Sequence, residues 1–82
     1  MTTMVALRLF ASAREAAGTG VDDVPGATVG EVLDQAADRY GPGFGAELGQ
    51  CRIWCNGEPA ARDDLVTDDD EVAVLPPVSG GC

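Results

Sequence analysis

Two consecutive glycines, Gly80 and Gly81, stand just before the last residue of the sequence. Glycine has no side chain, so such a segment can thread a narrow channel and let another protein's backbone approach closely. A glycine carboxylate at a chain end is also an unhindered electrophile once it is activated. Here Cys82 follows and holds that carboxylate in a peptide bond. The alternative interpretation is a flexible end without a function, which is common at chain termini.

The cysteines Cys51, Cys55 and Cys82 are the other reactive side chains. Their odd number argues against a closed disulfide framework, and a Cys-x3-Cys pair without histidine is weak evidence for a metal site. We expect Cys51 and Cys55 to be small core residues. The acidic run 68–71 is interpreted as a solvated turn, so no metal site is predicted. The sequence has no histidine, the commonest general base.

Composition excludes several classes of partner. The formal net charge is -9, from 14 acidic and 5 basic residues. Nucleic acids and anionic membranes both require basic surfaces, so neither is an expected partner. No apolar run is long enough to cross a bilayer and no secretory signal is recognisable, so a cytoplasmic location is expected. The 82 residues suffice for one domain with one small core.

The first part of the chain predicts two strands around a short helix. Alternating apolar residues over 4–10 are typical of a half-buried strand. The alanine-rich segment 11–17 predicts a short helix that ends at Gly18. Residues 21–24 predict a second, short strand before a Pro-Gly pair.

The clearest helix signal begins at Thr28, which with Glu31 forms a capping box. The segment 41–43, Gly-Pro-Gly, ends this helix, and 44–48 adds one further turn. The apolar face of the helix consists of Val29, Val32, Leu33, Ala36, Ala37 and Tyr40.

The remaining elements are strands. Residues 51–55 predict one, the Asn56-Gly57 dipeptide a tight turn, and 58–60 a short return strand at a sheet edge because it contains proline. Residues 72–75 belong to the last strand. This order of elements predicts an α+β fold, a mixed sheet packed on one main helix.

The chain divides into a domain over 1–76 and a C-terminal tail over 77–82. Pro76-Pro77 stops the last strand. Because proline restricts its own backbone and that of its predecessor, this step would hold the tail away from the sheet.

Both ends of the sequence resemble the MoaD family, the small subunits of molybdopterin synthase. The resemblance implies the β-grasp (ubiquitin-like) fold. The ThiS thiamine sulfur carriers are similar but are usually shorter and lack the Pro-Pro-Val-Ser step. The segments that carry the resemblance are Leu9-Phe10-Ala11-x-x-Arg14-Glu15-x-x-Gly18 and Asp70-Glu71-Val72-Ala73-Val74-Leu75-Pro76-Pro77-Val78-Ser79-Gly80-Gly81.

The resemblance also implies a mechanism for a sulfur carrier, not an enzyme. An E1-like partner would adenylate the Gly81 carboxylate with ATP, and a sulfur donor would then convert it to a thiocarboxylate. The tail would deliver this sulfur inside the large subunit of molybdopterin synthase. ATP would bind the activating partner, and the chain itself would hold no cofactor stably.

Three other functions remain as alternatives. The chain could carry sulfur for cysteine, thiamine or a secondary metabolite. It could be a ubiquitin-like modifier joined to lysines through Gly81, or a plain interaction module.

Two features depart from the family pattern. Asp68-Asp69-Asp70 replaces the usual Asp-Gly-Asp, and we expect the turn to persist. Cys82 would block the chemistry of Gly81. The first explanation for Cys82 is a pro-residue removed by a JAMM-type peptidase. The others are a cysteine built on the carrier thiocarboxylate and an engineered handle.

The side chains of the first and last strands that should point away from the core predict a docking patch beside the tail. Arg8 and Phe10 should point away from the core, as should Leu75, and the family places the first and last strands side by side. The alternative for Phe10 is that it closes the core edge, and Trp54 either covers the sheet or adds a contact. The predicted docking residues are Arg8, Phe10, Leu75, Pro76, Pro77, Val78 and Ser79.

Overall fold

The computed structural model describes residues 3–49 and 51–75. The predictions for 76–82, which include the docking residues Pro76 to Ser79 and the tail itself, lie outside the described residues. In chain order the elements are β1 (Met4–Leu9), α1 (Ala11–Ala17), β2 (Val21–Pro25), α2 (Val29–Tyr40), α3 (Pro42–Leu48), β3 (Arg52–Cys55), β4 (Glu58–Pro59) and β5 (Glu71–Leu75).

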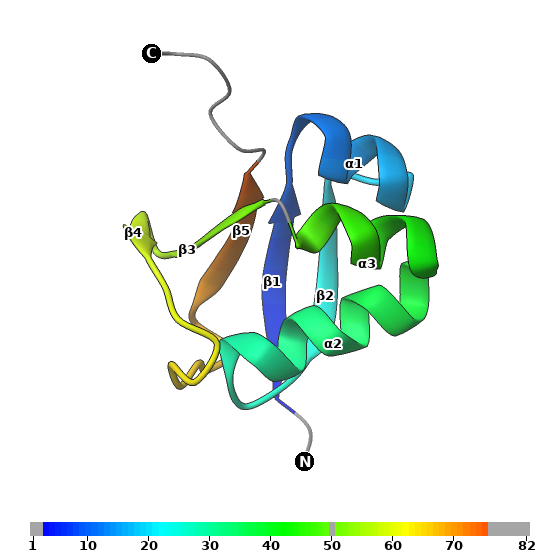
Figure 1. The fold of residues 1–82 in the computed structure, drawn as a ribbon. Helices are drawn as coiled ribbons and strands as arrows, with labels where there is room; N and C mark the ends of the chain where they lie inside the picture. The colour runs from blue at the N-terminus through cyan, green and yellow to red at the C-terminus, as the bar shows by residue number, and fades with distance from the viewer. Residues whose placement is uncertain (1–2, 50, 76–82) are drawn as a thin grey trace, which may run out of the picture.

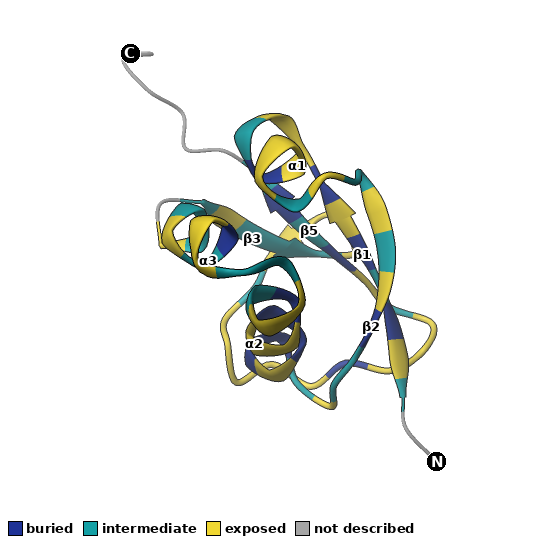
Figure 2. Ribbon diagram, turned by 90° about the vertical axis from the view of Figure 1, so that its right-hand side faces the viewer, coloured by how far each residue is buried: buried dark blue, intermediate teal, exposed yellow. Residues whose placement is uncertain are grey.

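The five strands form one mixed sheet in the order β2-β1-β5-β3-β4. The central pair, β1 and β5, is parallel, and all other pairs are antiparallel. β4 lies at an edge, as its proline predicts. All three helices cover the same side of the sheet (Figures 1 and 2). The α+β prediction is therefore confirmed, and the first and last strands are neighbours.

The core lies between the sheet and the helices. Alternate residues of the strands form the side of the core that belongs to the sheet, and the apolar stripe of α2 forms most of the opposite side. Figure 2 shows the buried residues where the helices meet the strands. The core residues are Val5, Leu7, Leu9, Ala13, Val24, Val29, Val32, Leu33, Ala36, Phe44, Val66, Val72 and Val74.

α2 begins with the predicted cap. Thr28 Oγ1 accepts a hydrogen bond from Glu31 N at 3.2 Å, and Glu31 Oε1 accepts one from Ala27 N at 3.2 Å. In a capping box the Glu31 side chain would accept from the N–H of Thr28, but here it accepts from the N–H of the preceding residue, Ala27. The helix ends at Tyr40, and Gly41 has a positive φ of 97°.

The segment after Gly41 forms more helix than the single turn predicted for it. α3 runs from Pro42 to Leu48 and buries Phe44, whose ring contacts that of Tyr40 edge to face at 5.1 Å. Proline suits the first position of a helix because its missing N–H has no partner there in any case.

The acidic turn before β5 persists without glycine. Asp70 accepts hydrogen bonds from Thr67 N at 2.8 Å and from Asn56 Nδ2 at 2.8 Å. Asn56, with a positive φ of 53°, also accepts from Glu71 N at 3.0 Å. These bonds lower the pKa of Asp70, first through Asn56. They also tie the β3–β4 turn to the start of β5.

Candidate docking face

The face of the sheet that the helices leave uncovered carries the predicted patch. Register places Arg8 opposite Ala73 on one side and Trp54 opposite Ala73 on the other. Arg52 is paired with Leu75 in the next row. Because neighbouring residues in register point to the same face, these side chains form two rows across β1, β5 and β3.

Phe10 continues the first strand into this face. Its N–H donates to Val74 O at 3.2 Å, which extends the parallel ladder by one residue. Ala11 then has a positive φ of 50°, so the chain turns sharply into α1. Phe10 is 39% exposed and is not part of the core. Phe10 therefore lies outside the buried core.

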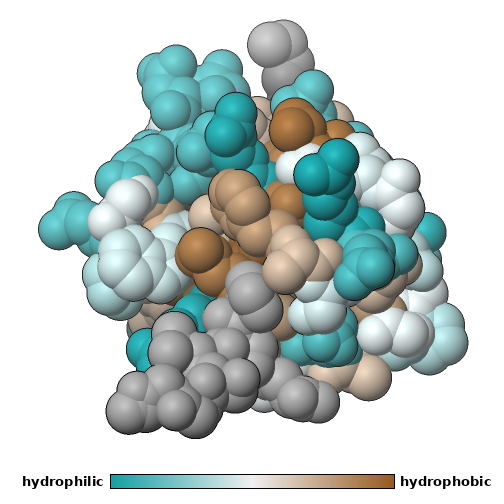
Figure 3. All heavy atoms as spheres, turned by 90° about the horizontal axis from the view of Figure 1, so that it is seen from above, coloured by the Kyte–Doolittle hydropathy of each residue, from teal (hydrophilic) through white to brown (hydrophobic). Residues whose placement is uncertain are grey.

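Four apolar residues form what we call the open-face patch: Phe10, Trp54, Ala73 and Leu75. With Gly57 and Glu71 they line an open hollow of about 260 Å³. Figure 3, which views the end where β5 finishes, shows hydrophobic side chains exposed there. An exposed apolar cluster bordered by polar residues is typical of an interaction site.

The structure brings the predicted residues Arg8, Phe10 and Leu75 to one face, and their role in docking stays a prediction. Sequence reasoning left the role of Trp54 open and did not identify Ala73 or Gly57 as part of the surface. Only the lateral order of β1, β5 and β3 places these residues together. Alternation along the single strands does indicate which side each of them faces.

The electrostatics of the patch come from nearby charged groups. Arg8 Nε lies 3.1 Å from Glu71 Oε2, and both side chains are about half exposed. A surface pair of this kind contributes little to stability.

The two cysteines of the described residues, Cys51 and Cys55, are poorly placed to act as nucleophiles. Cys51 and Cys55 are half-buried and pack against the margin of the core. Burial raises the pKa of both thiols, with smaller contributions from Glu47 at Cys51 and from Asp70 at Cys55. A raised pKa lowers the thiolate fraction and therefore the reactivity.

Two other classes of site are missing from the described part of the chain. Within 3–49 and 51–75, no group of three His, Cys, Asp or Glu residues is arranged to hold a metal ion. No helix within those ranges has the length and apolarity needed to cross a membrane.

Solved structures share this fold along nearly the whole chain. The solution structure of small archaeal modifier protein 1 from Methanosarcina acetivorans is 32% identical, with a TM-score of 0.87 and 99% of each chain covered. A chain of the Amycolatopsis orientalis BexX/CysO complex is 26% identical, with a TM-score of 0.78 over 94% of this chain and 99% of that one.

A third similar chain comes from the complex of subunits 1 and 2 of the Helicobacter pylori molybdopterin-converting factor. It is 25% identical, with a TM-score of 0.68, over 95% of this chain and 99% of that one. No curated protein sequence matches significantly.

The ThiS family matches residues 7–81. This range begins within β1, includes all the later elements and the Gly-Gly pair, and stops one residue before Cys82. The fold and this match agree with the family resemblance of the two chain ends. The chain belongs to the ThiS family of small ubiquitin-like carrier proteins and has their β-grasp fold.

Proposed function

We propose that the chain carries sulfur on Gly81, once Cys82 has been removed, and donates it in molybdopterin synthesis. The observation that carries this proposal is the extent of the family match, which ends at Gly81 and leaves Cys82 outside. The match therefore includes both Gly80 and Gly81. The half-buried, less reactive thiols of Cys51 and Cys55 support a role for the terminus over one for these side chains.

The chemistry begins with a hydrolysis. Water adds across the Gly81–Cys82 peptide bond in a JAMM-type peptidase, which releases cysteine and a free Gly81 carboxylate. That carboxylate attacks the α-phosphorus of ATP in an E1-like partner, and pyrophosphate leaves. A sulfur nucleophile from a donor then displaces AMP from the carbonyl carbon, which leaves a thiocarboxylate. ATP serves the partner, and this chain supplies the acyl group and the docking surface.

The molybdopterin assignment is supported by the Helicobacter pylori complex of two molybdopterin-converting factor subunits. By analogy, the tail of this chain would enter a large subunit. The open-face patch lies at the end of the sheet where β5 finishes, so a partner bound there would also meet the residues that follow Leu75.

The similarity to small archaeal modifier protein 1 favours a second candidate, conjugation to other proteins. In that case a lysine amine, and not sulfur, would capture the activated Gly81. All five basic residues of this chain are arginines. Any isopeptide-linked product would therefore contain a different protein as the acceptor. Carriage of sulfur for cysteine, thiamine or a secondary metabolite is a third candidate, which the similarity to a chain of the BexX/CysO complex supports.

The test is the intact mass of the protein recovered from its own cells, combined with a probe that reacts with thiocarboxylates. We expect a species that lacks Cys82 and has one carboxyl oxygen replaced by sulfur. Isopeptide-linked adducts without a thiocarboxylate would instead support the modifier. Full-length chain alone, in cells that contain an active E1-like partner, would contradict the proposal.

A further inference from the structure

The longer free edge of the sheet is strand β2 (Figure 1). In an antiparallel pair, every second residue directs its N–H and C=O groups to the neighbouring strand, and the residues between direct them away. The C=O of Gly20 and the N–H of Gly26, on either side of β2, bond to the β1 side at 2.9 and 3.1 Å. The even-numbered residues therefore bond to β1, and the backbone groups of Val21, Asp23 and Pro25 point to the free edge.

Side chains occupy all four outward backbone groups of Val21 and Asp23. Thr19 Oγ1 donates to Val21 O at 3.0 Å and accepts from Val21 N at 3.4 Å. Asp23 N donates to Asp22 Oδ1 at 2.8 Å, and Asp23 O accepts from Arg39 Nη1 at 2.9 Å. The proline that ends β2 has no N–H. Within β2, all of which the structure describes, no outward N–H is left for another strand.

The end of α2 holds part of this arrangement in place. Arg39 and Tyr40 are the last two residues of α2, and both donate to Asp22 Oδ2, with Arg39 Nη1 at 2.8 Å. We call Thr19, Asp22, Arg39 and Tyr40 the edge cap. The Arg39 and Asp22 side chains are 42% and 29% exposed, and a surface ion pair of this kind contributes little to stability. Its main consequence is that the edge of β2 is occupied.

The charge of Asp22 would also oppose pairing with a second copy of the chain. A two-fold antiparallel pair of β2 strands that uses all four outward groups sets Val21 opposite Asp23 of the second copy. The same register sets Asp22 opposite Asp22 in a pair that is not hydrogen-bonded, where side chains are closest. Like charges directly opposite each other are destabilising. Asp22 thus obstructs this pairing twice, by occupying Asp23 N and by repulsion.

We propose that the edge cap keeps the chain monomeric by closing β2 to a second copy. Without the cap, the β2 strands of two copies would pair antiparallel and join the two sheets into one. An uncovered edge strand is a template for such pairing, and charged residues and proline are common protections. The opposite edge, β4, has only the residues Glu58 and Pro59 and offers less to pair with. The inference does not depend on the function proposed for Gly81.

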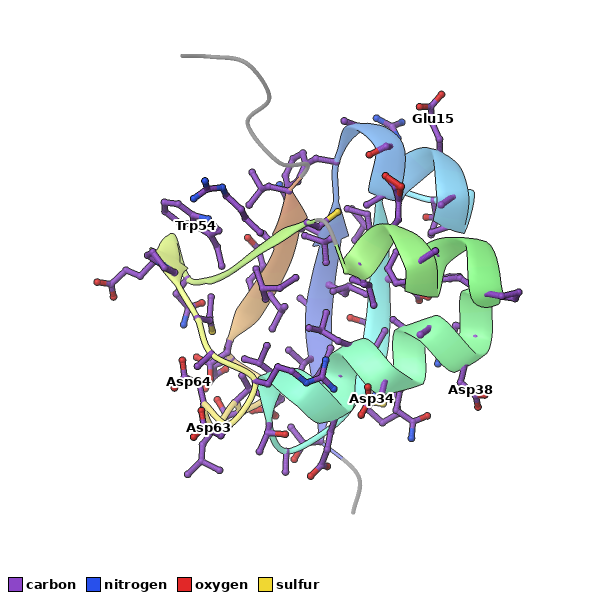
Figure 4. The ribbon with its side chains drawn as sticks, in the orientation of Figure 1. Glu15, Asp34, Asp38, Trp54, Asp63 and Asp64 are labelled. Atoms are coloured by element: carbon purple, nitrogen blue, oxygen red, sulfur yellow. The ribbon has the colours of Figure 1, made fainter. Side chains whose placement is uncertain are left out.

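The experiment is sedimentation equilibrium of the full chain, in a reducing buffer that prevents disulfide-linked dimers. The variant is Asp22→Ala with Arg39→Gln, which removes one charge of each sign and leaves the net charge at -9. The matched control is Asp34→Ala with Arg62→Gln. It breaks another exposed ion pair, of 2.6 Å, and also leaves the net charge unchanged. Asp34 lies on α2, and Arg62 precedes Asp63 in the loop after β4 (Figure 4).

Self-association should become stronger only in the edge-cap variant. We expect its Kd for dimer formation to be at least about tenfold lower than that of the wild type, because both outward groups of Asp23 are freed and the like charges are removed. The control should change the Kd by less than about twofold. The wild type should be monomeric at concentrations at which the edge-cap variant is a dimer.

Amide hydrogen exchange identifies the surface that the dimer uses. In the dimer, the N–H groups of Val21 and Asp23 should exchange about tenfold more slowly than in the diluted monomer, because the second copy occupies them. The N–H groups at positions 22 and 24, which are directed at β1, should not change. Urea unfolding checks the fold of each variant. If the double variant does not fold, Arg39→Gln alone decides the question, since that side chain is 42% exposed.

Three outcomes would overturn the inference. The first is a folded edge-cap variant that associates no more than the wild type or no more than the control. The second is a dimer in which the N–H groups of Val21 and Asp23 gain no protection, since it would use another surface. The third is a wild type that already pairs through β2. Each leaves the carrier function of Gly81 untouched.

Discussion

The two faces of the sheet are built from alternate residues of the same strands, and they differ in almost every property. On β1, Leu7 and Leu9 are buried against the helices, while Arg8 between them is exposed. On β5, Val74 is fully buried and Leu75 is half-exposed. One face closes a core and the other presents a hollow flanked by arginines. We therefore expect substitutions on the covered face to change stability and those on the open face to change docking, since the two faces use alternate residues.

The largest expected effect is at the covered face. Leu7→Ala removes a fully buried side chain and leaves a cavity, so it should lower the free energy of unfolding by about 3 kcal/mol. Leu75→Ala, on the open face, should cost about 1 kcal/mol because Leu75 is already half-exposed. Urea denaturation of both variants measures the difference. Equal losses would show that the open face also holds the fold together.

A steric effect of similar kind is expected at Gly26, in the turn before α2. A Cβ there would stand 2.7 Å from Val32 Cγ2 and 2.8 Å from Val32 N, so the backbone must shift. Gly26→Ala should therefore destabilise the protein by about 2 kcal/mol. Gly57, on the open face, has no atom within 4 Å of its Cβ position but has a φ of 83°. Gly57→Ala should cost about 1 kcal/mol, from backbone strain alone.

The helix cap tests whether destabilising the covered side impairs docking. Thr28→Ala removes the acceptor for Glu31 N and should cost about 1 kcal/mol. At a temperature where the variant remains folded, its KM with the activating partner should equal that of the wild type. A raised KM for a fully folded Thr28→Ala would show that the two faces are coupled.

Acid should weaken the fold modestly through two carboxyl groups. Hydrogen bonds from Tyr40 and then from Arg39 lower the pKa of Asp22, and one from Asn56 lowers that of Asp70. A carboxyl group with a depressed pKa in the folded state stabilises the fold above its unfolded pKa. That stability is lost as pH falls below about 4 through the folded pKa. Urea midpoints across this range should fall, and Asp22→Asn should reduce the fall.

The smallest effect is expected in alkali. Burial, and next the hydrogen bond to Asp22, raise the pKa of Tyr40 to about 12. The phenol therefore contributes stability below its unfolded pKa, and this contribution disappears as pH rises from about 10. Tyr40→Phe should flatten the alkaline loss of stability. An unchanged alkaline limb would contradict the assignment.

Local patterns were enough to predict the elements that are strongly periodic. The alternation in 4–10 predicted β1, and the capping box at Thr28 predicted the start of α2. α2 buries four of the six residues predicted for its apolar face. The turn at Asn56-Gly57 forms with positive φ at both residues. In each case the deciding interaction is within a few residues, so the sequence contains it directly.

Non-local contacts were harder to predict. The length of α3 depends on Phe44 packing against Tyr40 and the core, which no local pattern in 41–48 shows. The turn at Asp68-Asp69-Asp70 persists as expected and has no positive φ, and the contact that its sequence does not show is the hydrogen bond that Asp70 accepts from Asn56 Nδ2. The hollow of the candidate site combines residues of β3 and β5 with Phe10, which follows β1, and Gly57, which follows β3. Its existence depends on the lateral order of these three strands.

The most direct test of the carrier account compares the chain ending at Gly81 with the full chain ending at Cys82. Both are supplied to the E1-like partner with ATP, and pyrophosphate exchange is measured. The account predicts exchange only for the shorter chain, because only there is the glycine carboxylate free, and peptidase treatment should restore exchange to the longer one. Equal exchange by both chains, or none by the chain ending at Gly81, would contradict the claim that Gly81 is the working group.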